Sequence, residues 1–222
     1  MDPEVRLEPF EARVLGVLVE KSLTVPDSYP LSLNALTLGC NQKTARDPVL
    51  AASDAEVQGA VDALKALSLA FESSGSRVSR YEHNMGRVLG LPSQSVALLA
   101  TLMLRGPQTA SELRTASERL HRFADISAVE GFLDELATRA DEKGGPLAVK
   151  LPRAPGAREP RWAHLLSGAV DASSFAAASE VEAIVPVSEL AALKSRVSIA
   201  ETELERLRGL VDRLYGELDI RR

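Results

Sequence analysis

The chain of 222 residues has a single cysteine, Cys40, so it has no partner for an internal disulfide and no CxxC pair for a metal or redox site. It lacks any run of about 18 apolar residues, the length that a membrane-spanning helix needs. The first residues, MDPEVRLEPFEARVLG, carry acidic side chains where a signal peptide has a basic stretch followed by an apolar one. We therefore expect a cytoplasmic protein with no membrane association.

An excess of positive charge is absent as well. The chain has 26 Lys and Arg against 31 Asp and Glu, a formal net charge of −5. This balance removes the simplest argument for a polyanion-binding protein, although a local basic patch is compatible with it. Hydrophobic residues make up 45% of the chain, enough to form the cores of two compact units that are followed by a tail.

Motifs of catalysis are also missing. The sequence has no Walker loop, no GxGxxG after a predicted strand, no GxSxG and no clustered pair of carboxylates. None of the histidines, His83, His121 and His164, lies at a metal-ligand spacing. Cys40 lies near the end of an apolar helical segment, where a small buried thiol is expected rather than a nucleophile. We expect a protein that is not an enzyme and holds no cofactor or metal.

The apolar pattern of the first part of the chain predicts three helices and a hairpin. Helical spacing predicts an amphipathic helix over 9–21 and a short helix from about Ser32. Ser53 and Glu56 form a capping box for a third helix. Two β-capable runs then flank the Ser-Gly-Ser turn at 74–76. This is the order of a winged helix, a variant of the helix-turn-helix.

The same order recurs in the second part of the chain. A helix over 96–103 is followed by a Gly-Pro stop signal. Capping boxes at Thr109 and Glu112 and at Ser127 and Glu130 predict two further helices, and a longer hairpin with a Pro- and Gly-rich tip follows. The apolar positions assigned to these two helices are Leu113, Ala116 and Leu120, and Val129, Phe132, Leu133 and Leu136.

The fold predicted is mainly α with small β-hairpins, of the α+β class. Winged-helix domains are expected at 1–88 and 89–168, and an Ala- and Ser-rich flexible linker at 169–186. Residues 187–222 carry a heptad stripe that predicts a coiled-coil helix. Flanking charges of opposite sign favour a parallel homodimer, with antiparallel pairing or a helix that folds back as alternatives. The predicted dimerisation residues are Leu190, Leu193, Val197, Leu204, Leu207, Val211, Leu214 and Leu218.

Residues 11–48, EARVLGVLVEKSLTVPDSYPLSLNALTLGCNQKTARDP, resemble the signature of the YceH-like family of uncharacterised bacterial proteins. The motifs EARVLG, EK, TxP, YPLSLNAL and CNQKxxRDP occur in this order. The resemblance implies tandem winged-helix domains and, by fold analogy alone, an association with DNA. It also implies Asn at position 45, where this chain has Ala45.

The basic residues of the two hairpins are the candidate nucleic-acid contacts, because both third helices are acidic. The third helix of a helix-turn-helix normally enters the major groove, but here these helices offer mainly carboxylates, which repel a duplex. Ordinary solvated side chains are the alternative, and Trp162 either packs its hairpin or stacks on bases. The acidic positions are Asp54, Glu56, Asp62, Glu130, Asp134 and Glu135, with only Lys65 and Arg139 as cations. The candidate contacts are Arg77, Arg80 and Arg87, with His83 beside them, and Lys150, Arg153, Arg158 and Arg161.

The polar segment between the second and third helices of the first unit is another candidate. It could be a recognition loop, or its side chains could brace an irregular turn, and both alternatives stay open. The segment is residues 41–48, with Asn41, Gln42, Lys43 and Arg46 as candidates, and Tyr29 and Asn34 beside it share the same two alternatives.

Two hypotheses of function follow. The first is a DNA-associated regulatory protein, whose basic hairpins contact double-stranded DNA and whose coiled coil forms a homodimer. The second is a protein-interaction adaptor without direct DNA binding, similar to the tandem winged-helix segregation subunits of condensin-like complexes. The first explains the basic hairpins, and the second explains the acidic third helices.

Overall fold

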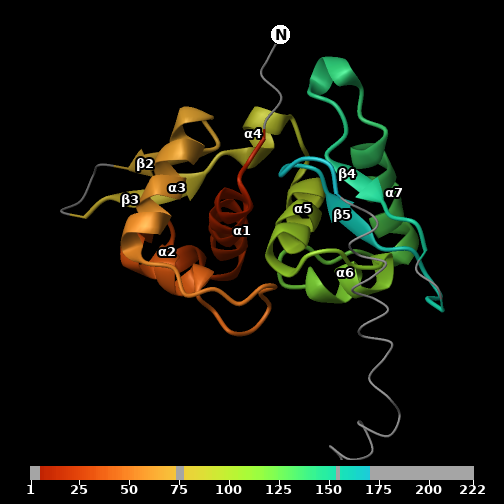
Figure 1. Ribbon diagram of the computed structural model, residues 1–222, viewed down its shortest axis with the longest axis horizontal. Coiled ribbons are helices and arrows are strands. Elements are labelled where there is room, and N and C mark those ends of the chain that lie inside the picture. Colours follow the sequence, from red (N-terminus) through yellow and green to blue (C-terminus); the bar gives the residue numbers. More distant parts are fainter. Residues whose placement is uncertain (1–5, 74–77, 154–155, 171–222) are drawn as a thin grey trace, which may run out of the picture. The chain divides into compact units, whose positions relative to one another are not determined.

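Helices alternate with small antiparallel sheets along residues 6–73, 78–153 and 156–170, the residues that this computed structural model describes. The α+β class predicted from the sequence is confirmed. The order of three helices and a hairpin occurs twice, and we name residues 9–83 the first repeat and residues 93–164 the second repeat. In Figure 1, helices α1 and α5 lie side by side, with the other elements of each repeat on the outer side of its own helix.

The first repeat follows the predicted order closely. The Ser53–Glu56 capping box is confirmed, since Ser53 Oγ accepts from the Glu56 amide at 3.3 Å and Glu56 accepts from the Ser53 amide at 2.8 Å. The predicted hairpin is confirmed by strand pairing, in which Ala70 faces His83. Its elements are α1 (Pro9–Thr24), a 3-10 turn η1 (Pro26–Ser28), β1 (Leu31–Ser32), α2 (Leu33–Cys40), α3 (Asp54–Ala66), β2 (Ala70–Ser73) and β3 (Arg80–His83).

The second repeat confirms the Thr109–Glu112 capping box, with bonds of 2.9 and 3.2 Å. Helix α5 ends before Gly106, whose φ of 72° suits glycine. Its elements are α5 (Ser93–Arg105), α6 (Ala110–Ala116), α7 (Ile126–Ala137), a 3-10 turn η2 (Asp141–Lys143), β4 (Ala148–Lys150) and β5 (Trp162–His164).

Two predictions for the second repeat were wrong. The third helix begins at Ile126 and not after Ser127, because Asp125 is the N-cap and its carboxylate accepts from the Ala128 amide at 2.8 Å. The second helix does not reach Leu120. It ends at Ala116, after which the chain turns with the Leu120 amide bonded to the Ser117 carbonyl at 2.8 Å.

Each repeat also has a short pairing that the sequence did not predict. In the first repeat, β1 adds to the free edge of β3, giving the order β1-β3-β2 with Leu31 opposite Tyr81. In the second, Gln108 takes the place of β1 and exchanges two backbone hydrogen bonds with Trp162, at 2.7 and 3.1 Å. The buried rings of Tyr81 and Trp162 therefore occupy equivalent positions.

The core continues from one repeat into the other through α1 and α5. Every residue of Ala12–Val19 and of Ser95–Leu104 is buried, so α1 is covered on all sides in its middle and is more than the amphipathic helix that was predicted. The helices approach closely at Gly16, where a Cβ would lie 3.0 Å from Leu104 Cγ. The two repeats therefore share one hydrophobic core.

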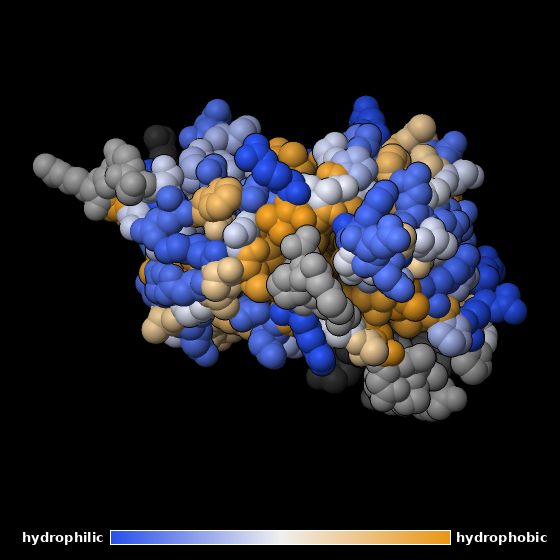
Figure 2. Space-filling model, turned by 90° about the horizontal axis from the view of Figure 1, so that it is seen from above, coloured by the Kyte–Doolittle hydropathy of each residue, from blue (hydrophilic) through white to orange (hydrophobic). Residues whose placement is uncertain are grey.

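A short helix that was not predicted, α4 (Met85–Leu89), connects the repeats, and the expected domain boundary at 88/89 falls within it. Figure 2 shows apolar surface in the middle of the face seen from above, with hydrophilic surface on either side. Val88 of α4 is 36% exposed.

We expect Gly39→Ala to lower the free energy of unfolding by about 1–3 kcal/mol, because the added Cβ overpacks a filled core. That Cβ would lie 2.6 Å from Val17 Cγ1, where α2 crosses α1. The matched control is Gly59→Ala on α3, whose Cβ meets nothing within 4 Å. It should raise the stability by up to about 1 kcal/mol through helix propensity. Urea denaturation measures both, and the same sign of change in both variants would contradict this packing.

Candidate functional site

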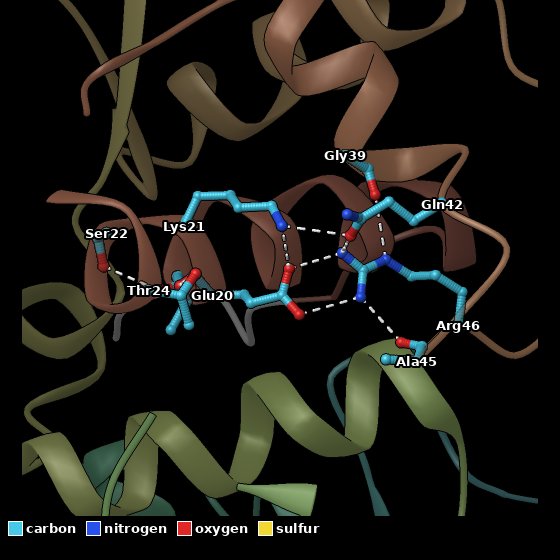
Figure 3. Close-up of polar contacts among 9 residues, drawn as sticks. Glu20, Lys21, Ser22, Thr24, Gly39, Gln42, Ala45 and Arg46 are labelled. Atoms are coloured by element: carbon cyan, nitrogen blue, oxygen red, sulfur yellow. Dashed lines mark hydrogen bonds and ion pairs between the residues drawn. The ribbon is translucent and has the colours of Figure 1, made fainter. Parts of the chain in front are cut away.

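The loop between α2 and α3, residues 41–53, folds back on α1 and is centred on Arg46 (Figure 3). The Arg46 side chain is 0% exposed. Each of the five N–H groups of its guanidinium has an acceptor. The bonds are Nε to the Gly39 carbonyl at 3.1 Å, a fork to the Glu20 carboxylate at 2.6 and 3.1 Å, and single bonds to Gln42 Oε1 at 2.7 Å and the Ala45 carbonyl at 2.8 Å. Arg46 therefore has no free donor for a ligand.

A second buried arginine, Arg13 of α1, holds the same loop. It donates to the Cys40 carbonyl at 3.4 Å and to the two carbonyls of Asp47-Pro48 at 2.9 and 2.8 Å. The last carbonyls of a helix lack partners within the helix, and the partial negative charge there favours cations. Since Arg46 takes the carbonyl of Gly39, the two arginines together cap the C-terminal end of α2.

Glu20 supplies the carboxylate that Arg46 binds, and the charge of Asp47 also acts on Arg13. Burial alone would raise the pKa of Glu20, but the hydrogen bonds and charge of Arg46, helped by Lys21, hold that pKa below its ordinary value. Lys21 Nζ lies 3.0 Å from Glu20 Oε2. Burial lowers the pKa of Arg13, and the charge of Arg46 lowers it further.

Two more of the candidate recognition residues are engaged inside the protein. The Asn41 side-chain amide pairs with the backbone of Ala52 through two bonds of 2.8 Å. The Tyr29 hydroxyl accepts from the His83 amide at 2.7 Å, and burial raises the pKa of Tyr29. The tyrosine ring also meets the His83 ring edge-on, with centroids 6.4 Å apart.

The structure thus divides the six recognition-loop candidates into two groups. Four of the side chains make hydrogen bonds inside the protein, as the bracing alternative describes. They are Tyr29, Asn41, Gln42 and Arg46. Two others, Asn34 and Lys43, are exposed, and a contact of these two with nucleic acid stays a prediction. The engagement of Arg46 with Glu20 had no signal in the sequence, because the partners are far apart along the chain.

The loop also ties the first repeat to the second. The Asp47 amide donates to the Leu104 carbonyl at 2.8 Å, near the C-terminal end of α5. A second backbone bond, from the Leu7 amide to the Leu166 carbonyl at 2.7 Å, joins the start of the described chain to its end. The polar loop is therefore an intramolecular clamp.

The described part of the first hairpin is not strongly basic. Arg80 is exposed, but it donates to a backbone carbonyl at 2.8 Å and shares the hairpin with Glu72 and Glu82. Arg87 is exposed on α4 and lies off the hairpin. Arg77 lies outside the described residues.

The second hairpin is basic, with four exposed cations, Lys150, Arg153, Arg158 and Arg161. Glu159 is the one carboxylate in its sequence. Trp162 is only 1% exposed, and Lys150 Nζ lies 5.3 Å from the centre of its ring. Arg161 lies 4.0 Å from Glu112 of α6 in a half-exposed pair that contributes little to stability. Of the four candidates, Lys150 ends β4, and Arg153, Arg158 and Arg161 lie in the connection between β4 and β5.

The exposed faces of α3 and α7 are more acidic than the sequence indicated. The sequence assigned one cation to each helix, but Arg139 lies beyond the end of α7 at Ala137, so α7 itself has none. Lys65 pairs with Glu72 of β2. Arg139 donates to the Leu89 and Gly145 carbonyls. The six predicted carboxylates of these helices, those of Asp54, Glu56, Asp62, Glu130, Asp134 and Glu135, are all exposed.

Burial shifts the pKa values of the cysteine and of two partly buried histidines. Burial raises the pKa of the Cys40 thiol to about 12. Burial lowers the pKa of His83, whose Nε2 lies 3.2 Å from Ser22 Oγ, and lowers the pKa of His164 to about 4. No group of three or more His, Cys, Asp and Glu side chains within residues 6–73, 78–153 and 156–170 could hold a metal ion.

Two sequence predictions concern membrane-spanning helices and the C-terminal region. None of the helices in the described part of the chain is both long and apolar enough to cross a membrane. The predicted linker and coiled coil lie outside the described residues except for the first two linker positions, and so do the dimerisation candidates, Leu190, Leu193, Val197, Leu204, Leu207, Val211, Leu214 and Leu218.

We expect Ala45→Asn to raise the free energy of unfolding by about 1 kcal/mol, because Ala45 has a φ of 59°, a conformation that Asn and Gly tolerate better than Ala. Ala45→Gly should act in the same direction, and it adds no atoms to the loop. Thr44→Asn on the neighbouring exposed residue is the control and should change the stability by less than about 0.5 kcal/mol. Denaturation curves in which neither Ala45 variant gains stability would contradict strain at this position.

We expect His164 to make the protein less stable in acid. Its pKa is about 4 in the folded chain against an ordinary value of 6.5, so between these values the unfolded chain binds a proton that the folded chain does not. The free energy of unfolding should therefore fall by up to about 3 kcal/mol as the pH is lowered across this window. Above the ordinary pKa this group should have no effect. Denaturation at several pH values should show a smaller loss of the free energy of unfolding with falling pH for His164→Gln than for the wild type. An equal loss in both would refute this role.

The comparisons with other proteins agree with each other. The profile of a family described as "Protein of unknown function, DUF480" matches residues 7–157. A UPF0502 protein of Burkholderia multivorans is 63% identical over 216 residues, which cover 96% of this chain and 90% of the relative. A UPF0502 protein of Leptothrix cholodnii is 60% identical over 217 residues, 96% of both chains. One of Burkholderia pseudomallei is 62% identical over 214 residues, 96% of this chain and 90% of the relative.

The resemblance to a family of uncharacterised bacterial proteins is confirmed by these findings, while the YceH-like name remains a prediction. The matches extend well beyond the signature at 11–48, over nearly the whole chain. The chain belongs to the DUF480 family, whose relatives in these three bacteria are UPF0502 proteins.

Proposed function

We propose that each repeat is a winged helix. In the first repeat the order α1, β1, α2, α3, β2, β3 supports this assignment, with β1 paired to the last strand. In the second repeat Gln108 pairs with Trp162 in place of a first strand. A helix-turn-helix followed by a hairpin is the arrangement that such domains use on DNA.

We propose that the protein is a DNA-associated regulatory protein that contacts nucleic acid through its second hairpin. The observation that carries the proposal is the set of four exposed cations on that hairpin, Lys150, Arg153, Arg158 and Arg161, against a single carboxylate. Phosphate contacts from Lys and Arg supply most of the affinity of non-specific DNA binding. The first hairpin, with Arg80 beside two glutamates, supports the proposal less well.

A protein-interaction adaptor without direct DNA binding is the second candidate. The acidic faces of α3 and α7 favour it, because they would repel phosphates and attract a basic protein surface. Mid-helix glycines at equivalent positions, Gly59 and Gly131, lie on these faces with open space around them. Absence of a DNA shift at about 50 mM salt, with a defined partner whose capture requires Asp62 and Asp134, would favour this candidate.

The triple variant Arg153→Glu, Arg158→Glu, Arg161→Glu should abolish the mobility shift of duplex DNA at about 50 mM salt, because it replaces phosphate contacts by repulsion. The matched control reverses three exposed arginines of the same repeat that lie off the hairpin, Arg105, Arg119 and Arg122. Both variants have the same net charge, so a general charge effect would weaken the DNA binding of both equally. Equal retention of DNA by the wild type and the hairpin variant would reject the hairpin as the contact.

A further inference from the structure

We infer that the loop between α2 and α3, the intramolecular clamp, holds strand β5 of the second repeat in place. Opening of the clamp at Arg46 should then loosen the pairing of Gln108 with Trp162, although both residues lie in the other repeat. Such coupling is a property of the folded chain and does not depend on the proposed binding of DNA. The path from the clamp to β5 runs only through residues that the structure describes.

Asp47 connects the arginine cluster to the second repeat. Its carbonyl accepts from Arg13 Nη2 at 2.9 Å, and its amide donates to the Leu104 carbonyl at 2.8 Å. Leu104 is 3% exposed, and its carbonyl is among the last of α5, which have no partner within the helix. Arg46 precedes Asp47 in the chain, and its side chain is fixed by five hydrogen bonds. The clamp therefore places a donor where a carbonyl of a buried residue needs one.

The contact continues from the end of α5 to β5 along a short stretch of chain. Asp47 Oδ2 would lie 3.7 Å from a Cβ on Gly106, so the clamp also packs against the residue at which α5 ends. The Gln108 side chain donates to the Gly106 carbonyl at 3.3 Å, and its backbone exchanges two bonds with Trp162. Only three residues separate Leu104 from Gln108, and one is a proline, whose ring fixes its φ. A shift at the clamp therefore reaches β5 with little slack.

The first hairpin has local support for which the second repeat has no counterpart in its described residues. In the first repeat, β1 pairs with two residues of β3. Tyr29 and Pro30, just before β1, accept two further hydrogen bonds, from the His83 amide and the Arg80 side chain. At the equivalent place beside β5 the described chain has a single bridge residue, Gln108. The second repeat thus takes from the clamp the support that the first repeat provides with its own residues.

Hydrogen exchange of single backbone amides in the full-length chain tests this coupling. The amides of Gln108 and Trp162 are the two reporters, because each donates to the carbonyl of the other residue. The exchange rate of a bonded amide measures how often its hydrogen bond opens. The Leu147 amide, which donates to the Leu136 carbonyl at 2.9 Å, is the reference for the rest of the second repeat.

Two variants open the clamp from the first repeat. Glu20→Gln removes the carboxylate onto which Arg46 forks, and Gln42→Ala removes a single acceptor of the same guanidinium. We expect each variant to raise the exchange rate of the two reporters at least about 5-fold more than that of Leu147. The milder Gln42→Ala keeps the test decisive if the Glu20 variant does not fold.

The matched control is Tyr81→Phe, which removes a hydrogen bond to Gln58 within the first repeat and leaves the clamp intact. It should raise exchange at the reporters and at Leu147 by the same factor. Equal rises at all three amides in the clamp variants would overturn the coupling, because these variants would then lower only the overall stability. Unchanged exchange at the reporters would overturn it as well, since the clamp would then open without any effect on β5.

Discussion

The two buried arginines at the C-terminal end of α2 are the interaction on which the rest of the arrangement depends. Arg46 uses all its donors and forks onto Glu20, and Arg13 holds the carbonyls that follow. A buried ion pair by itself is weak evidence of stability, because desolvation offsets the attraction. Here the guanidinium groups also satisfy carbonyls that would otherwise be buried without partners, so removal of either arginine would leave several acceptors unpaired.

This cluster joins the motifs on which the predicted YceH-like resemblance rests. Arg13 lies in EARVLG, Glu20 in EK, and Arg46 in CNQKxxRDP, and the structure brings the three motifs to one point. The backbone bond from Asp47 to Leu104 then extends the effect to the second repeat. The signature side chains with these contacts are internal, so they explain how the repeats are held together, and the proposed nucleic-acid contact lies on a different surface, the second hairpin.

Features fixed by near neighbours in the sequence could be predicted, and features fixed by distant partners could not. The capping boxes at Ser53 and Thr109 were predicted because the motif and its hydrogen bonds lie within one helical turn. The same rule placed the start of α7 wrongly, because Asp125 competes with Ser127 as a cap and the downstream apolar spacing suits both starts. The two-residue strand β1 is too short to show an alternating pattern.

The candidate site divides in the same way. The cations of the second hairpin are evident in the sequence, and their exposure agrees with that pattern. The internal bonds of Asn41 and Arg46 are not evident, because an amide or a guanidinium in a polar loop has the same appearance whether it faces solvent or the core. The internal contacts of Lys65 and Arg139 could not be predicted either, since Lys65 pairs with a residue of β2 and Arg139 donates to the last residue of α4, both on other elements of the fold.

The position of Trp162 has a practical consequence. It is the single tryptophan of the chain, it is buried at the base of the basic hairpin, and the ammonium of Lys150 lies over its ring. Tryptophan fluorescence therefore comes from the Trp162 position alone, and a cation close to the indole face influences that fluorescence. The protein thus contains its own optical reporter, which can follow both unfolding of the second repeat and any rearrangement of Lys150 without an added label.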